Sequence, residues 1–189
     1  MKTDIIILIC LISLLCGLIA GLIISVLYYP KWEVKRILKQ QKKVGCKFGE
    51  WNHFKTLVDH NFKAIVKPNC ETLYSVTFIQ RKDGPYILQM PAFDSYFSFA
   101  FLNNNTDVIG YITNRDANKK TNSLFLISYD KKEFESLKLP GIILDTNICW
   151  IIGRFAVNNP AEIPLINKIQ DSVQLTKLKE YTDEKSKKD

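Results

Sequence analysis

The segment Pro68-Asn69-Cys70-Glu71-Thr72-Leu73-Tyr74-Ser75 decides the fold that we expect for this chain of 189 residues. A Pro-Asn pair favours a turn, because proline fixes its φ angle and an asparagine side chain hydrogen-bonds to its own backbone two residues on. The residues that follow are mostly apolar, β-branched or aromatic, and they continue into the run Leu73–Ile79. The sequence therefore predicts a turn that starts a buried core strand.

Several other segments share this β-type composition and end at Asn, Asp, Gly or Pro. We predict strands at Lys63–Val66, Leu73–Ile79, Tyr86–Met90, Tyr96–Leu102, Val108–Thr113, Ser123–Ser128 and Cys149–Val157. Their spacing is typical of a mainly β, antiparallel β-sandwich. The polar segment Gln80–Gly84 ends in glycine and predicts a short hairpin between the second and third strands.

Two short helices complete the predicted domain. Lys131–Leu137 is long enough for one or two helical turns, and Ala161–Gln170 carries isoleucines at helical spacing. The second helix also has a capping residue, Asn159, followed by Pro160 in its first turn. We expect the charged tail to be disordered beyond Tyr181.

The N-terminal segment Ile5–Tyr29 contains 25 residues without a charge and is rich in Ile and Leu. As a helix it would extend for about 37 Å, which exceeds the roughly 30 Å hydrocarbon core of a bilayer. We therefore predict a transmembrane helix that contacts the lipid bilayer through residues 5–29. A cleaved signal peptide is the alternative, but its apolar region is usually about 7–15 residues long and ends at small residues of the Ala-x-Ala type, and neither feature fits this run.

Most of the net charge of +7 lies near this helix. Residues 1–43 contain 7 Lys and Arg and 2 Asp and Glu, so the rest of the chain has a net charge of only +2. A nearly balanced domain does not favour a nucleic-acid surface. We predict that the basic residues after Pro30 form a juxtamembrane helix, that its lysines contact anionic head groups, and that it ends near Gly45.

Recognised catalytic and cofactor motifs are missing from the sequence. It contains no Cys-x-x-Cys, no glycine-rich phosphate loop, no Gly-x-Ser-x-Gly and no His-Glu-x-x-His. We therefore predict no cofactor, no metal site and no catalytic residue. His53 and His60 are expected to be solvated or at the core edge. Cys46, Cys70 and Cys149 are expected to be buried thiols, with one disulfide as an open alternative.

A set of short motifs in a fixed order resembles a known family. The motifs are Pro68-Asn69, Thr72-Leu73-Tyr74-Ser75, Gly84-Pro85-Tyr86 with Pro91, Tyr96-Phe97-Ser98-Phe99, Tyr111-Ile112 with Arg115, Ile152–Val157, Asn159–Glu162 and Gln170-Asp171. They resemble the domain-of-unknown-function family 1254 from roughly Trp51 to Leu178. This chain departs from the family pattern at Cys70-Glu71, where Arg-Asp is usual, and at Asn103–Asp107, where the family carries Asp-x-x-Thr-Asn.

The resemblance implies a jelly-roll-like β-sandwich that is often fused to, or encoded beside, a companion domain of unknown-function family 1214. It also implies a short, membrane-anchored member placed in the cell envelope or periplasm. The positive-inside rule instead favours a cytoplasmic domain. We place the domain on the periplasmic or outer side, because a few lysines beside a single anchor with a short N-terminal tail determine orientation only weakly.

The candidate ligand-binding residues are Asn69, Glu71, Tyr74 and Arg154. Arg154 is a charge within an apolar strand, and a buried arginine needs a partner. Four carboxylates could supply it: Glu71, Asp94, Asp107 and Glu162. A structural role for the turn and an ion pair or exposed position for Arg154 are the simpler interpretations, and an anionic ligand is the alternative.

These observations divide the chain into an anchor at 1–30, a basic juxtamembrane segment at 31–50, a β-sandwich at 51–178 and a charged tail at 179–189. The preferred function is that of a membrane-anchored envelope protein, without assigned catalysis, that binds a companion protein resembling family 1214. The alternative is an enzyme or binding protein for an anionic small molecule, for example a phosphorylated one. A homo-oligomer stays open.

Overall fold

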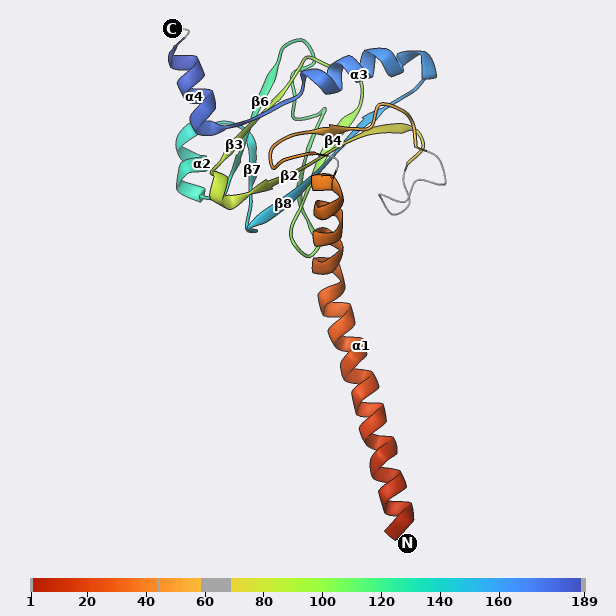
Figure 1. The fold of residues 1–189 in the computed structure, drawn as a ribbon. Coiled ribbons are helices and arrows are strands. Elements are labelled where there is room, and N and C mark those ends of the chain that lie inside the picture. The colour runs from red at the N-terminus through yellow and green to blue at the C-terminus, as the bar shows by residue number, and fades with distance from the viewer. Residues whose placement is uncertain (1, 44, 59–68, 188–189) are drawn as a thin grey trace.

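The computed structural model describes residues 2–43, 45–58 and 69–187 (Figure 1). The elements in chain order are α1 (Lys2–Lys43), β1 (Asn52–His53), β2 (Thr72–Gln80), η1 (Arg81–Asp83), β3 (Tyr86–Met90), β4 (Phe97–Leu102), β5 (Val108–Thr113), β6 (Ser123–Ser128), α2 (Lys131–Leu137), β7 (Gly141–Ile143), β8 (Ile148–Ala156), η2 (Pro160–Glu162), α3 (Ile163–Ser172), β9 (Gln174–Lys177) and α4 (Leu178–Ser186). The predicted strand Lys63–Val66 lies outside the described residues.

Two sheets form the domain. One has the strand order β1-β2-β8-β4-β5, and the other has the order β7-β6-β3-β9. Every pair of neighbouring strands is antiparallel except β6 and β7, which are parallel. The predicted mainly antiparallel β-sandwich, with a long N-terminal helix and a short C-terminal helix, is confirmed.

Aromatic side chains fill the space between the sheets. Phe97, Phe99 and Phe155 are at most 1% exposed, and the rings of Phe99 and Phe155 meet edge to face at 5.8 Å. Gly153 lies in this layer because a Cβ there would come within 2.8 Å of the Phe99 ring. The register of β2, β8 and β4 is thus fixed by large rings packed around a residue without a side chain.

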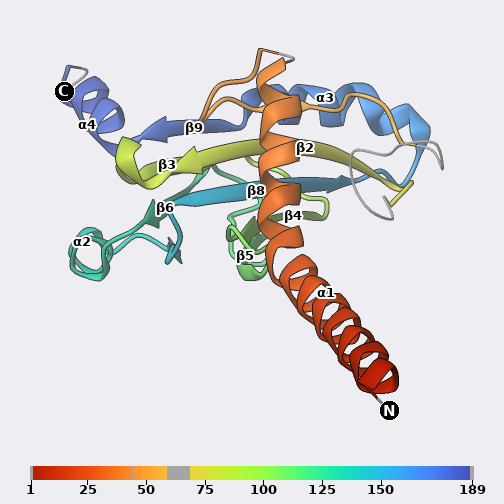
Figure 2. The ribbon, with the colours of Figure 1, turned by 60° about the horizontal axis from the view of Figure 1, so that its bottom comes forward.

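A second apolar cluster covers the outer face of the five-stranded sheet. Val34 and Ile37 in the last turns of α1 are buried there, at 4% and 5% exposure. They pack against side chains from three strands: Tyr74, Val76, Phe78, Ala100, Leu102, Trp150 and Ile152. Figure 2 shows α1 crossing the strands of this sheet before it leaves the domain. The segment after Pro30, expected only as a juxtamembrane helix, therefore forms part of the core.

α1 ends at Lys43, close to Gly45, where the sequence predicts the end of the helix. Gly45 has a φ of 87°, its N–H donates to Lys42 O at 3.1 Å, and the Cys46 N–H donates to Gln41 O at 3.1 Å. This pattern of backbone bonds closes a helix with a glycine in the left-handed region.

Two expectations for the chain after β2 are wrong. Gln80–Gly84 does not close a hairpin, because β2 pairs with β1 and β8 in one sheet while β3 pairs with β6 and β9 in the other. The short helix η1 and Gly84 instead carry the chain from one sheet to the other. The tail beyond Tyr181 is helical in α4, where Glu180 in the first turn and Lys185 in the last complement the helix dipole.

Candidate functional site

The turn before β2 is organised by the side chain of Asn69. Its Oδ1 accepts a hydrogen bond from the Glu71 N–H at 2.8 Å, so the predicted asparagine turn is confirmed. The Asn69 N–H itself donates to the hydroxyl of Tyr74 at 2.8 Å. Asn69 and Glu71 are exposed, whereas Tyr74 is 1% exposed, so a buried phenol anchors a surface turn.

Arg154 lies beside this turn. It is directly opposite Tyr74 in the β2–β8 ladder, and its guanidinium carbon lies 5.9 Å from the centre of the Tyr74 ring. Within the described parts of the chain no carboxylate lies within ion-pair distance of Arg154, so none of the four suggested partners is used. A partly buried cation held by a ring face keeps its N–H donors available for an anion.

The structure therefore brings the four predicted site residues together at one end of β2. Tyr74 connects them, since its hydroxyl contacts the Asn69 backbone and its ring faces Arg154. The exposed carboxylate of Glu71 in the same turn reduces the attraction of this place for an anion.

The opposite face of β2 carries a polar cluster that the sequence did not predict. Nδ1 of His53 lies 2.8 Å from the hydroxyl of Ser75, and Nε2 of Gln170 donates to that hydroxyl at 3.0 Å and to Tyr74 O at 3.1 Å. Gln170 is fully buried, and its Oε1 has no hydrogen-bond partner among the residues that the structure describes. These residues are far apart in the sequence and form no recognised motif, so only the tertiary structure reveals the cluster.

Burial determines the protonation of His53. Desolvation, reinforced by the positive charge of Lys55 and opposed by the negative charge of Asp171, lowers the pKa of His53 from 6.5 to about 4. The imidazole is thus neutral at pH 7, and the Ser75 hydroxyl can donate to it while accepting from Gln170. A histidine beside a serine hydroxyl is the geometry of an activated nucleophile, but Ser75 is only 1% exposed, so no substrate reaches it in this conformation.

The segment after β1 is attached to α3 by a small network near this cluster. The Lys55 ammonium donates to Asn167 O at 3.1 Å and to the Asp171 carboxylate at 2.5 Å. The Asn167 amide donates back to Lys55 O at 3.1 Å. These contacts hold His53 against Ser75 and support a structural role for the cluster. His60, the other histidine, lies outside the described residues.

The cysteines only partly match expectation. All five are free thiols. Cys149 is buried, and desolvation raises its pKa to about 12, so it is an unreactive core thiol. Cys70 is exposed and Cys46 is intermediate, so the prediction of buried thiols is wrong for Cys70. Cys70 is exposed because the turn at Asn69 directs this part of the chain to the surface.

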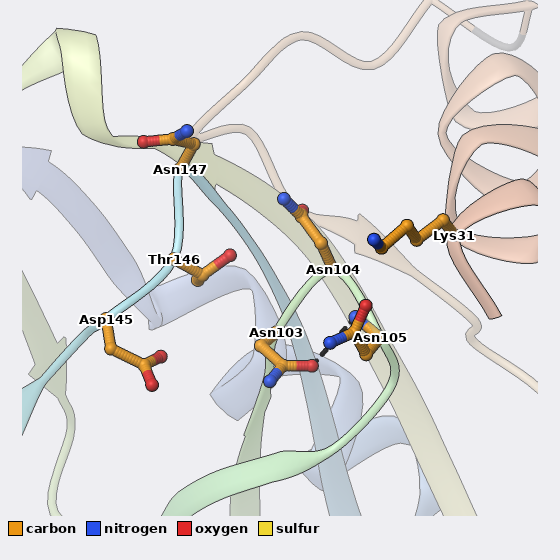
Figure 3. Close-up of a pocket in the computed structure, with 7 residues that line it drawn as sticks. All are labelled: Lys31, Asn103, Asn104, Asn105, Asp145, Thr146 and Asn147. Carbon is orange, nitrogen blue, oxygen red and sulfur yellow. Dashed lines mark hydrogen bonds between the residues drawn. The ribbon is translucent and has the colours of Figure 1, made fainter. Parts of the chain in front are cut away.

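A polar pocket of about 340 Å³ lies at another place, between α1 and two loops of the domain (Figure 3). Its lining residues are Lys31, Asn103, Asn104, Asn105, Asp145, Thr146 and Asn147. A second cavity of about 330 Å³ continues along α1 and shares Lys31 and Asn104 with it. No single segment of the sequence indicates this pocket, because its walls come from three distant parts of the chain.

The two packed sheets, with the end of a long helix on one outer face, make this chain a β-sandwich protein. The family model described as "Protein of unknown function (DUF1254)" matches residues 48–177, and the chain belongs to this family. The resemblance based on its short motifs is thereby confirmed.

One solved structure, that of a Vibrio protein, supports the fold. The chain is similar to the VPA0106 protein from Vibrio parahaemolyticus, with a TM-score of 0.60 and 13% identity, over 84% of this chain and 38% of that protein. It is also similar to an uncharacterised protein from Burkholderia cenocepacia, with a TM-score of 0.49 and 11% identity, over 77% and 39% of the two chains. The chain thus spans less than half the length of either structure. No curated protein sequence matches it significantly.

Among the described residues, one helix, Thr3–Lys43, is long and apolar enough to cross a membrane by length and composition. A signal sequence near an N-terminus meets the same criteria.

Proposed function

We propose that this protein is held in a membrane by α1 and uses its β-sandwich to bind a companion protein chain there, without catalysis of its own. The anchoring rests on the contrast between the two parts of α1. The apolar side chains before Pro30 are exposed, at 51–67% from Ile5 to Tyr29, whereas Val34 and Ile37 beyond it are buried on the sheet. A run of exposed Ile and Leu of this length needs an apolar environment, and a bilayer provides it.

The observation that carries the binding function is an exposed apolar patch on the outer face of the five-stranded sheet, formed by Val108 and Tyr111 on the edge strand β5. These residues are 45% and 55% exposed. Val108 pairs with Leu102 and Tyr111 with Ala100, both in the cluster that α1 covers, so the patch continues the face that α1 only partly covers. Exposed tyrosines beside apolar groups favour a protein interface.

A companion domain resembling family 1214 is the occupant that we propose for this patch. This chain aligns with only 38% of the similar Vibrio protein, so most of that protein lies outside the shared sandwich. A companion protein would supply the equivalent surface in trans. We place the sandwich on the periplasmic or outer side of the membrane. The lysines of α1 do not oppose this placement strongly, because they determine the orientation of a single membrane helix only weakly.

Photo-crosslinking from native membranes tests this function. A photoreactive residue at Tyr111 is expected to capture a chain carrying the companion domain, identified by mass spectrometry. The same residue at Lys132, on the exposed helix α2, is the matched control and should capture nothing specific. Adducts only with a second copy of this chain would show a homo-oligomer instead, and no adduct at Tyr111 would contradict the proposal.

One observation favours a second candidate function, the binding of an anionic small molecule at Arg154. The guanidinium contacts the Tyr74 ring and has no carboxylate partner within the described segments. Inorganic phosphate and pyrophosphate should then raise the melting temperature of the wild type, with no such effect in Arg154→Leu. If Arg154→Leu folds normally and neither anion shifts the wild type, this candidate is excluded.

A further inference from the structure

The pocket in Figure 3 includes Lys31, which follows the apolar run of α1 directly after Pro30. Tyr28, Tyr29 and Trp32 are exposed at the end of the apolar run, and Tyr and Trp gather at membrane–water interfaces. Lys31 lies among them, with its ammonium 5.7 Å from the centre of the Tyr28 ring, and it also lines the pocket. If α1 spans the membrane as proposed above, the pocket faces the lipid head groups.

The walls of the pocket are preorganised. The Asn103 side chain accepts hydrogen bonds from the N–H groups of Asn105 and Asp107, at 2.8 and 3.0 Å, and fixes the turn between β4 and β5. On the other wall, Asn147 O accepts from the Arg81 N–H at 2.9 Å, and the Thr146 hydroxyl donates to Ile148 O at 2.9 Å. These hydrogen bonds engage backbone groups and the side chains of Asn103 and Thr146, and they fix both walls of the pocket.

The remaining polar groups of the pocket are free to bind a ligand. Across the residues that the structure describes, no hydrogen bond engages the side-chain amides of Asn104, Asn105 and Asn147. Each amide offers both donors and an acceptor. Figure 3 shows the Lys31 ammonium and the Asn104 amide on one side of the pocket.

The two charges of the pocket are opposite in sign and lie on opposite sides of it (Figure 3). Asp145 is on the loop before β8, whereas Lys31 is on α1. Neither forms an ion pair with another described residue. An anion alone would be repelled by Asp145 and a cation alone by Lys31, whereas a ligand with both charges matches both sides.

We propose that this pocket binds the phosphoethanolamine head group of a membrane phospholipid. Lys31 and the amides of Asn104 and Asn105 contact the phosphate oxygens, and the Asp145 carboxylate accepts hydrogen bonds from the primary ammonium. A cavity of about 340 Å³ is in the range of small-ligand sites. A choline head group lacks the N–H donors that Asp145 needs, and a glycerol head group lacks the positive charge. This inference rests on the membrane anchoring proposed above, but not on the companion protein.

The preference of the protein for one lipid head group over another tests the proposal directly. The full chain is reconstituted into phosphatidylcholine nanodiscs, and the relative association of spin-labelled phosphatidylethanolamine, phosphatidylglycerol and phosphatidylcholine is compared. We expect a roughly two- to fivefold preference for phosphatidylethanolamine over phosphatidylcholine, as for one partly exposed charged hydrogen bond. Asp145→Asn should remove this preference, and Lys31→Gln should weaken association of all three lipids. Asp183→Asn on α4, on the far side of the domain from α1, is the control and should behave as wild type.

Three results of the lipid comparison would overturn the proposal. These are equal association of the choline and ethanolamine lipids, an unchanged preference in Asp145→Asn, or a stronger preference for phosphatidylglycerol, which would indicate an anion site. Displacement of the lipid by soluble phosphoethanolamine at equal concentration would show a soluble ligand and overturn the lipid assignment. Alkaline carbonate extraction of native membranes tests the anchor separately, so a failure of anchoring is distinguishable from a failure of head-group selectivity.

Discussion

At the residue scale, Gly153 shows how closely the side chains of β2, β8 and β4 pack on the inner face of the five-stranded sheet. A Cβ at this position would lie 2.8 Å from the Phe99 ring and 3.3 Å from the Ser75 Cβ. We expect Gly153→Ala to lower the free energy of unfolding by about 1–3 kcal/mol, because the ring has to move within a filled core. Urea unfolding followed by tryptophan fluorescence measures the change.

Phe99→Leu in the Gly153→Ala background makes room for the new methyl group. The double variant should lose less stability than the sum of the two single variants, since the residues are in contact. Additive losses, or a Gly153→Ala variant as stable as wild type, would show that the side chains around Gly153 are less tightly packed than the distances indicate.

His53 makes stability depend on pH in a definite direction. Its pKa falls from 6.5 in the unfolded chain to about 4 in the folded one, because desolvation disfavours the charged imidazole. The stability that the folded state owes to a neutral His53 is therefore fully present above pH 6.5 and is lost as the pH falls toward 4. The shift corresponds to about 3 kcal/mol at most, and we expect about 1–2 because the partly exposed ring is screened by solvent.

Chemical denaturation between pH 7 and pH 4 measures this loss. His53→Asn is the matched variant, because its amide can still pair with the Ser75 hydroxyl but does not titrate. The slope of stability against pH should be smaller in His53→Asn. Identical slopes in the two proteins would show that the imidazole is not desolvated as its burial indicates.

At the element scale, the last turns of α1 act as part of the sandwich. Ile37 is 5% exposed in the cluster with Phe78 and Trp150, whose rings stack at 5.8 Å. Ile37→Ala should lower the free energy of unfolding by about 2–4 kcal/mol, as for other buried isoleucines. Lys39→Ala, on an exposed position of the same helix, should change it by less than about 0.5 kcal/mol. Equal effects of the two changes in thermal unfolding would contradict this role of α1.

The sequence patterns predict best those elements whose period is visible within one segment. Tyr86–Met90, Val108–Thr113 and Ser123–Ser128 have the predicted bounds, because each alternates or buries its apolar residues between clear turn residues. β1, β7 and β9 were missed, because each has at most four residues and exists only through pairing with a distant strand. The hairpin at Gln80–Gly84 was wrong for a related reason, since the turn composition does not say which sheet receives the next strand.

The candidate site shows the same limit. The asparagine turn at Asn69 is local chemistry and could be predicted, and so could the unusual position of Arg154 in an apolar strand. The contact of Arg154 with the Tyr74 ring depends on the β2–β8 register. The cluster of His53, Ser75 and Gln170 joins a short edge strand, a core strand and a helix, so no window of the sequence contains it.

At the scale of the whole molecule, the exposed apolar run and the sandwich are joined by one continuous helix. α1 has Pro30 within it and extends unbroken from the exposed apolar run to the buried turns on the sheet. No loop separates these two parts of the helix, so the helix fixes the direction in which the apolar run leaves the domain (Figure 1). The pocket at Lys31 and the exposed patch at Tyr111 therefore keep constant positions relative to the bilayer if α1 spans it.

The boundary of the folding unit follows from this continuity. A soluble fragment that starts at Gly45 removes Val34 and Ile37 and uncovers Phe78, Trp150 and Ile152 on the outer face of the sheet. We expect this fragment to aggregate and to bind hydrophobic dyes, because it exposes a contiguous apolar surface. A fragment that starts at Lys31 keeps the covering turns and should be a soluble, cooperatively folded monomer. Size-exclusion chromatography and calorimetry compare the two.

Ile37→Asp in the longer fragment should reproduce the behaviour of the shorter one, because a carboxylate cannot be buried against Trp150. If the fragment from Gly45 is monomeric and as stable as the longer one, the end of α1 contributes nothing to the core, and the domain begins after the helix.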